Sequence, residues 1–319
     1  MDIRFLYRGA EEALKGAKRV LTISHKRPDG DTLGSAAAFS EYCRRQGVAV
    51  TSFCLDPVPD QYSYLLGIEY FTSDAKVFND RSVDVIVVFD SGDLRYAGVA
   101  ELMSAMPVRP FVVAFDHHAT NDRFADVNVI DATASSTAEV VYHFFQVCGV
   151  DIDAKLATCL LTGIFSDTDS FTNPATSESA LQAASYLIRR GAKIQTISGR
   201  LTHNKSVPSL RLWGQVLSRL KFDEKLNVAS TAVFAGDCCG LEGDQVEGIA
   251  NFLNNFLDAK VVLVLKEMAG GLVKGSFRTA EDVDVSVIAK ALGGGGHKKA
   301  AGFTIPGSIK ETDSGWRVE

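Results

Sequence analysis

Several features that mark specialised protein classes are missing from this sequence. No apolar run is long enough to cross a membrane, and the N-terminal stretch MDIRFLYRGAEEALKGAKRV lacks the apolar core and cleavage site of a signal peptide. The six cysteines are scattered and never form a CxxC pair, so nothing indicates a zinc ribbon or a disulfide framework. These absences predict a cytoplasmic protein without a membrane partner.

Positive charge is also scarce. The chain of 319 residues has 33 lysines and arginines against 39 aspartates and glutamates, for a net charge of -6. Proteins that track long nucleic acids normally need a broad basic face, so the charge argues against such a partner. Small phosphorylated molecules are still compatible with this charge, because bound cations and a local basic pocket can neutralise their phosphates.

The apolar runs predict an α/β fold in two domains. Four short runs are separated by segments of helical pattern, which is typical of a parallel sheet buried on both faces. These runs span residues 19–24, 48–53, 84–90 and 111–116. After residue 225 the pattern changes to that of a smaller mixed α/β domain. We expect a catalytic domain over 1–190, a helical linker over 191–225 and a second domain over 226–319.

Acids and histidines gather where the predicted strands and helices end. The residues are His25, Asp29, Asp31, Asp90, Asp116, His117, His118 and Asp167. One such aspartate alone is most often a helix cap or a turn former. Together, at the carboxyl ends of parallel strands, the carboxylates would repel each other unless cations held them. Mixed carboxylate and imidazole ligands suit manganese, iron or zinc.

The charge of the cluster indicates two metal ions. Asp29, Asp31, Asp90 and Asp167 carry four negative charges, which two divalent cations would balance. Two neighbouring cations can activate a water molecule and stabilise an in-line displacement at phosphorus. The residues therefore predict hydrolysis of a phosphoester.

Five ordered motifs add a resemblance. SHKRPDGDTLGS, FDSGD, FDHH and FSDTDSF resemble the four motifs of the DHH phosphoesterase superfamily, and GGGGHKKAAGF is similar to the signature of its DHHA1 domain. Their order and pairing look most like the short bacterial members, the NrnA-type oligoribonucleases and pAp phosphatases, or nanoRNases. RecJ-like exonucleases would need further nucleic-acid-binding domains, and family-II-like pyrophosphatases would have a different second domain.

The resemblance implies a role for each residue of the cluster. Asp90 would bridge the two ions, Asp116 would orient His117, and His118 would lie near the scissile phosphate. The implied metal ligands are His25, Asp29, Asp31, Asp90, His117 and Asp167.

The second domain would hold the substrate. The backbone amides of Gly294, Gly295 and Gly296 suit a phosphate cradle, although the same glycines also suit a flexible loop or a helix end. The resemblance assigns Arg278 to a substrate phosphate and His297 to the terminal phosphate or base. A cleft between the domains would then limit the substrate length.

The resulting hypothesis is a metal-dependent phosphoesterase. It would hydrolyse oligonucleotides of two to a few nucleotides to mononucleotides, or 3′-phosphoadenosine 5′-phosphate (pAp) to AMP, with Mn²⁺ favoured and Mg²⁺ as the alternative. The alternatives are a phosphodiesterase for cyclic dinucleotides and a non-catalytic nucleotide sensor. A homodimer is also predicted.

Overall fold

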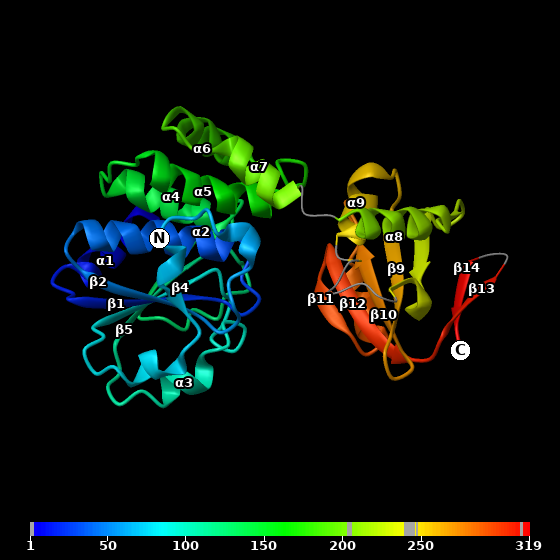
Figure 1. The fold of residues 1–319 in the computed structure, drawn as a ribbon, viewed down its shortest axis with the longest axis horizontal. Helices are drawn as coiled ribbons and strands as arrows, with labels where there is room; N and C mark the ends of the chain where they lie inside the picture. The colour runs from blue at the N-terminus through cyan, green and yellow to red at the C-terminus, as the bar shows by residue number, and fades with distance from the viewer. Residues whose placement is uncertain (1–2, 203–205, 239–245, 247, 313–314) are drawn as a thin grey trace. The chain divides into compact units, whose positions relative to one another are not determined.

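Two units divide the chain, Met1–Asn204 and Lys205–Glu319, and each is described by itself (Figure 1). The structure is a computed structural model that describes residues 3–202, 206–238, 246, 248–312 and 315–319. The expected linker over 191–225 includes one helix of the first unit and one of the second. The functional limits of the domains, and the cleft expected between them, stay predictions.

The first unit is built on a parallel sheet of order β3-β2-β1-β4-β5-β6. Every neighbouring pair is parallel, as the apolar runs predicted. The strands are β1 (Arg19–Ser24), β2 (Ala49–Cys54), β3 (Phe71–Thr72), β4 (Val85–Phe89), β5 (Phe111–Asp116) and β6 (Val127–Ile130). All of β4 is buried, which explains its uninterrupted apolar sequence.

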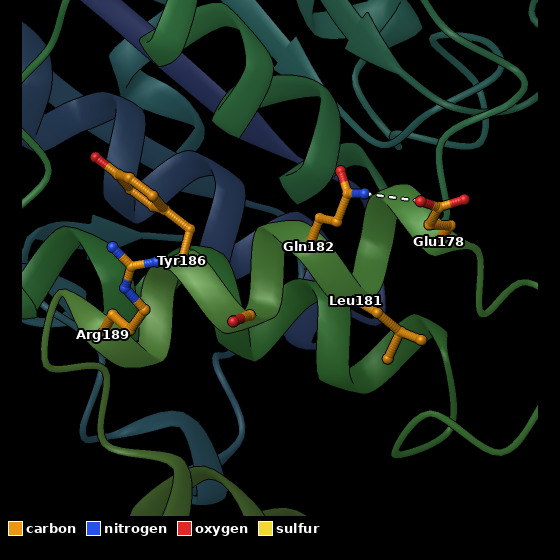
Figure 2. Close-up of a pocket in the computed structure, with 6 residues that line it drawn as sticks. Glu178, Leu181, Gln182, Tyr186 and Arg189 are labelled. Carbon is orange, nitrogen blue, oxygen red and sulfur yellow. Dashed lines mark hydrogen bonds between the residues drawn. The ribbon is translucent and has the colours of Figure 1, made fainter.

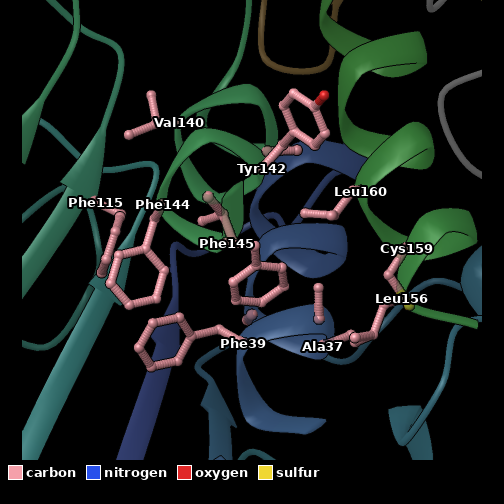
Figure 3. Packing of buried hydrophobic residues seen from close by; sticks show 14 of the residues in the cluster. Ala37, Phe39, Phe115, Val140, Tyr142, Phe144, Phe145, Leu156, Cys159 and Leu160 are labelled. Atoms are coloured by element: carbon pink, nitrogen blue, oxygen red, sulfur yellow. The ribbon is translucent and has the colours of Figure 1, made fainter. Parts of the chain in front are cut away.

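Helices cover both faces of this sheet (Figure 1). One face carries α1 (Ile3–Leu14), α2 (Gly30–Arg45) and α4 (Thr137–Val147). α5 (Ala154–Asp167) packs on α2 and α4, and α6 (Glu178–Arg189) and α7 (Ile194–Thr202) pack on α5. α3 (Ala100–Ser104) lies on the other face. Short 3₁₀ turns are η1 (Asp60–Tyr62), η2 (Ile68–Tyr70) and η3 (Ala75–Asn79). Phe39 of α2 packs against Phe115 of the sheet (Figure 3). The ring centroid of Phe39 lies 5.3 Å from that of Phe115 and also 5.3 Å from that of Phe89 in β4.

Glycines let α2 and α5 approach closely. A Cβ atom at Gly34 of α2 would lie 2.4 Å from the carbonyl oxygen of Cys159 in α5. A Cβ atom at Gly163 of α5 would lie 2.6 Å from Oδ1 of Asp31, which lies in the first turn of α2. The helix contact therefore brings the backbone of α5 directly against one acid of the cluster.

The second unit contains a mixed sheet of order β11-β12-β10-β9-β8-β7. Only β8 and β9 pair in parallel among its described strands, so the predicted smaller α/β domain is confirmed. Its strands are β7 (Lys221–Asp223), β8 (Val228–Val233), β9 (Val261–Met268), β10 (Leu272–Arg278), β11 (Gly295–His297) and β12 (Ala300–Pro306), and β13 (Ile309–Thr312) pairs with β14 (Gly315–Val318). Its helices are α8 (Val207–Ser218), the 3₁₀ turn η4 (Ala235–Cys238), α9 (Ile249–Phe256) and α10 (Val285–Ala291). In the part of the chain that the structure describes, no helix combines the length and apolarity that crossing a membrane requires.

A buried carboxylate fixes the start of α4. Glu139 is 1% exposed, and it accepts hydrogen bonds from the Ser135 backbone N–H at 2.7 Å and from the Ser179 hydroxyl of α6. Burial alone would raise the pKa of Glu139, but the contact with His143 and these two donors lower it to about 2. The ionised carboxylate thus joins α4 to α6.

We expect Gly34→Ala to lower the free energy of unfolding by about 1–3 kcal/mol, because its methyl group would overlap the α5 backbone. Gly199→Ala is the matched control, since its Cβ would meet open space within α7, and it should raise stability by about 0.5–1 kcal/mol. Urea denaturation followed by far-UV circular dichroism measures both effects. Tryptophan fluorescence would not report on this helix contact, because both tryptophans lie in the second unit. Equal effects of the two variants would contradict the close helix contact.

Glu139→Gln should destabilise the protein by about 2–3 kcal/mol at pH 7, because the stabilisation comes from a carboxylate with a lowered pKa. Such stabilisation is complete above the unfolded-state pKa of about 4.5 and is lost as the pH falls toward about 2. The difference between wild type and variant should therefore shrink over this range in urea titrations at successive pH values. The exposed Glu12→Gln is the control, and a difference independent of pH would refute the role of the charge.

Candidate metal centre

Strand and helix ends place the predicted acids and histidines together. β1, β4 and β5 are neighbours in the parallel sheet, so the residues that follow them meet at one edge. His25 follows β1, Asp90 follows β4, and His117 follows β5. Asp29 and Asp31 stand at the start of α2, and Asp167 is the last residue of α5. The predicted convergence of these side chains is confirmed.

The side chains form three groups, and within each the possible ligand atoms lie within 4.8 Å of one another. Asp90, His117 and His118 make one group, which shares a residue with each of the others. The other two have no residue in common: one is His25, Asp29 and Asp90, and the other is Asp31, His117 and Asp167. Asp90 faces both of these two groups, because its Oδ2 lies 3.3 Å from Nε2 of His25 and its Oδ1 lies 3.6 Å from Nε2 of His117.

The electrostatics show crowding of like charges. Burial raises the pKa of Asp31 and of Asp167, and the charge of Asp90 raises both further. Burial would also raise the pKa of Asp90, but the contacts with His25 and His117 lower it to about 2. Although burial opposes a charge on His117, its contact with Asp167 raises its pKa to about 10. The carboxylates are thus close enough to need positive partners.

This donor set fits divalent metal ions. Each group combines imidazole nitrogen with carboxylate oxygen, the mixture that manganese, iron and zinc accept. Cations at these positions would relieve the repulsion that raises the carboxyl pKa values. The grouping therefore suits a centre for two cations, with Asp90 facing both positions.

Asp116 acts on a different histidine from the one we expected. Its Oδ1 lies 2.7 Å from Nδ1 of His118, whereas it reaches His117 only through the backbone N–H at 2.9 Å. The expectation that Asp116 orients the His117 ring is therefore wrong. Oδ1 of Asp116 also accepts a hydrogen bond from the backbone N–H of His118 at 3.3 Å, so a local turn after β5 brings the His118 ring to this carboxylate.

Two polar residues near the centre were missed as functional candidates. Asn121 donates from Nδ2 to Oδ2 of Asp116 at 2.7 Å and so completes the support of His118. Thr137 donates to both Asp31 and Asp90. From the sequence, Asn121 could be placed only in a turn and Thr137 only at the start of a helix. Their hydrogen-bond partners became visible only in the folded structure.

Unusual backbone conformations surround the centre. Asp90 has a φ of 57°, and Asp169, Ser170 and Phe171 after α5 have φ values of 49°, 63° and 64°. Residues with a side chain adopt this left-handed region at a cost of about 1–2 kcal/mol each. Such conformations persist where surrounding contacts hold them, and they concentrate at functional sites.

In the second unit, Arg278 is half-buried at the end of β10. Its Nε donates to Oδ1 of Asn251 in α9 at 2.7 Å, and its Nη1 donates to the Phe277 carbonyl at 2.8 Å. Burial lowers the pKa of the guanidinium. The strand register aligns Arg278 with Ala300 of β12, and Ala300 with His297 of β11. The fold thus brings the backbones of both predicted substrate-binding positions to one end of the sheet.

The predicted glycine cradle is part of a strand pair. A Cβ atom at Gly294 would lie 2.1 Å from the Gly302 carbonyl oxygen, and Gly296 has a φ of 137°. These two glycines are therefore required by close backbone packing, whereas a Cβ atom at Gly295 would meet open space. A phosphate cradle there stays a prediction, and the side chain of His297 lies outside what the structure describes.

A surface hollow of about 490 Å³ lies elsewhere in the first unit (Figure 2). It is lined by one face of α6, and its residues include Leu181, Tyr186 and Arg189. None of its lining residues belongs to the three groups described above. It is therefore not a part of the candidate metal centre.

Comparisons with known proteins agree with the fold. The sequence model of the DHH family, N-terminal domain, matches residues 19–164, and that of the DHHA1 domain matches residues 230–313. The bifunctional oligoribonuclease and PAP phosphatase NrnA of Thermus thermophilus is 33% identical over 93% of this chain and 87% of that protein.

Two solved structures share the fold. An exopolyphosphatase-related protein from Bacteroides fragilis has a TM-score of 0.86 at 23% identity, covering 94% of this chain and 90% of that one. RecJ from Thermus thermophilus, solved in complex with Mn²⁺, has a TM-score of 0.54 at 17% identity, covering 95% of this chain and 52% of RecJ. With both domains matched in order and a relative aligned over most of its length, the chain belongs to the DHH family of phosphoesterases and carries a DHHA1 domain.

Proposed function

We propose that this protein hydrolyses short oligonucleotides to mononucleotides and pAp to AMP. The observation that carries the proposal is the set of ligand groups gathered around Asp90, within a chain of the DHH family. Its Thermus thermophilus relative is named an oligoribonuclease and PAP phosphatase, and that relative aligns across both domains. The acidic net charge of the chain agrees with a substrate that needs only local anchoring.

The six predicted ligands would hold two divalent cations. His25 and Asp29 would bind one, Asp31, His117 and Asp167 would bind the other, and Asp90 would bind both through its two oxygens. Cations bound there lower the pKa of a water molecule and neutralise phosphate charge. Mn²⁺ is the metal we propose, because both of these groups contain more carboxylates than imidazoles, and carboxylate oxygen suits manganese.

His118 would assist the leaving group. The hydrogen bond to Asp116 raises the pKa of His118, which favours the protonated ring. Because Nδ1 is engaged by Asp116, Nε2 is the nitrogen available to a substrate, and 35% of the side chain is exposed. A protonated imidazole at that position can stabilise charge at the phosphate and supply a proton to the departing oxygen.

The second unit would bind one end of the substrate. Arg278 offers a planar guanidinium that suits a phosphate, and Asn251 fixes its orientation. The glycine segment and His297 complete this part of the proposal on the strength of the family resemblance. A homodimer and a cytoplasmic location stay predictions, and sedimentation of the purified chain would test the first.

With Mn²⁺ present, wild-type protein should release mononucleotides from pApA and AMP from pAp, as resolved by chromatography. Asp90→Asn should lower both rates by more than about 100-fold, since loss even of an outer partner of a metal site typically costs about 10–100-fold. Asp122→Asn, an exposed aspartate in the loop after His118, is the matched control. Unchanged hydrolysis by Asp90→Asn would refute the site.

The same assay separates the alternatives. Faster cleavage of cyclic di-AMP than of pApA and pAp would identify a cyclic dinucleotide phosphodiesterase instead. Absence of hydrolysis by wild-type protein that binds both Mn²⁺ and nucleotide would favour the sensor.

His118→Asn should lower kcat by roughly 100-fold or more, the usual contribution of a positioned acid or base. Calorimetry should find the same number of bound Mn²⁺ ions as in wild type, because the ring acts on substrate and bonds to Asp116. Loss of one Mn²⁺ ion from the variant would show instead that His118 is a ligand.

A further inference from the structure

Thr137 connects two acids of the metal centre. It is the first residue of α4 and is fully buried. Its backbone N–H donates to Oδ2 of Asp31 at 2.6 Å, and its hydroxyl donates to Oδ1 of Asp90 at 3.0 Å. One residue therefore contacts two carboxylates that come from different elements of the fold.

The helix does not need this hydroxyl for its own cap. The side chain of Ser136 already accepts the hydrogen bond from the Glu139 N–H and so caps α4. Threonine hydroxyls in helices usually bond to backbone groups nearby. The Thr137 hydroxyl instead reaches a carboxylate 47 positions away in the chain.

The start of α4 also compensates the charge of Asp31. The Ala138 N–H donates to Oδ1 of Asp31 at 2.8 Å, so both carboxylate oxygens receive an N–H from the first turn. This end of a helix carries partial positive charge and favours a nearby anion. Asp31 is fully buried, and these donors fix its orientation before any cation binds.

Asp90 needs a comparable restraint. Its backbone adopts the left-handed conformation with a φ of 57°, and its two oxygens face different histidines. A rotation of this carboxylate would move one oxygen away from its group. The Thr137 hydroxyl bonds to Oδ1, the oxygen that faces His117, and so opposes that rotation.

We propose that Thr137 is a positioning residue of the metal centre, which sets the separation and orientation of Asp31 and Asp90 so that cations bind both groups tightly. This inference rests on the metal centre of the proposed function. The proposed positioning role belongs to the Thr137 hydroxyl, which bonds to Asp90. The Thr137 backbone N–H bonds to Asp31 whatever the side chain is.

Thr137→Val tests the link, because valine keeps the shape and the backbone N–H but lacks the hydroxyl. Titration calorimetry should give a Kd for Mn²⁺ that is about 10–100-fold higher than in wild type, as for other outer partners of metal ligands. At saturating Mn²⁺, kcat for pApA should fall while KM stays unchanged, and the electron paramagnetic resonance spectrum of the bound Mn²⁺ should differ from that of wild type.

Two further variants control the comparison. Thr137→Ser keeps the hydroxyl and should restore the affinity for Mn²⁺ and the spectrum. Thr162→Val removes another fully buried hydroxyl, one that bonds to the Thr158 carbonyl, and should leave the Kd for Mn²⁺ unchanged.

The proposal is overturned if Thr137→Val binds Mn²⁺ as tightly as wild type, or if Thr137→Ser binds it as weakly as Thr137→Val. Should circular dichroism show that the valine variant does not fold, Thr137→Ser and Thr137→Ala provide the same comparison, and equal Kd values would again overturn it. Wild-type protein that binds no Mn²⁺ would overturn both this inference and the proposed function. Wild-type protein that binds Mn²⁺ but cuts no substrate would overturn only the latter, since the calorimetry still tests Thr137.

Discussion

The repulsion between buried carboxylates at one sheet edge is the constraint on which this structure depends. Asp31, Asp90 and Asp167 come from three separate elements, and the fold brings them together at a cost in charge repulsion. Histidine rings, backbone N–H groups and one hydroxyl reduce that cost without removing it. Cations at these positions would supply the remaining compensation.

The sheet and most of the cluster could be predicted from the sequence, because both depend on local signals. Apolar runs indicated the strands, and the rule that ligands gather beyond the carboxyl ends of parallel strands placed His25, Asp90 and His117 together. Asp167 was predicted as a member because it ends an apolar helix, but the strand rule does not explain why that helix end joins the sheet edge.

The supporting contacts could not be predicted, because they join residues distant in the chain. Thr137 lies 106 positions from Asp31, and nothing in its neighbourhood indicates that partner. The partner of Asp116 was predicted wrongly for a different reason: an acid followed by two histidines does not reveal which ring it faces until the backbone direction is known. The glycine segment likewise suited two explanations until the strand pair showed which glycines the packing requires.

The contact of Gly163 with Asp31 restricts how this enzyme can diversify. Since even a methyl group at position 163 of α5 would collide with the acid, this position admits no side chain. Changes in substrate range must then arise on the solvent side, where residues such as His118 are partly accessible. Selection for new substrates would therefore keep Gly163 beside Asp31 and change residues on the solvent side of the centre.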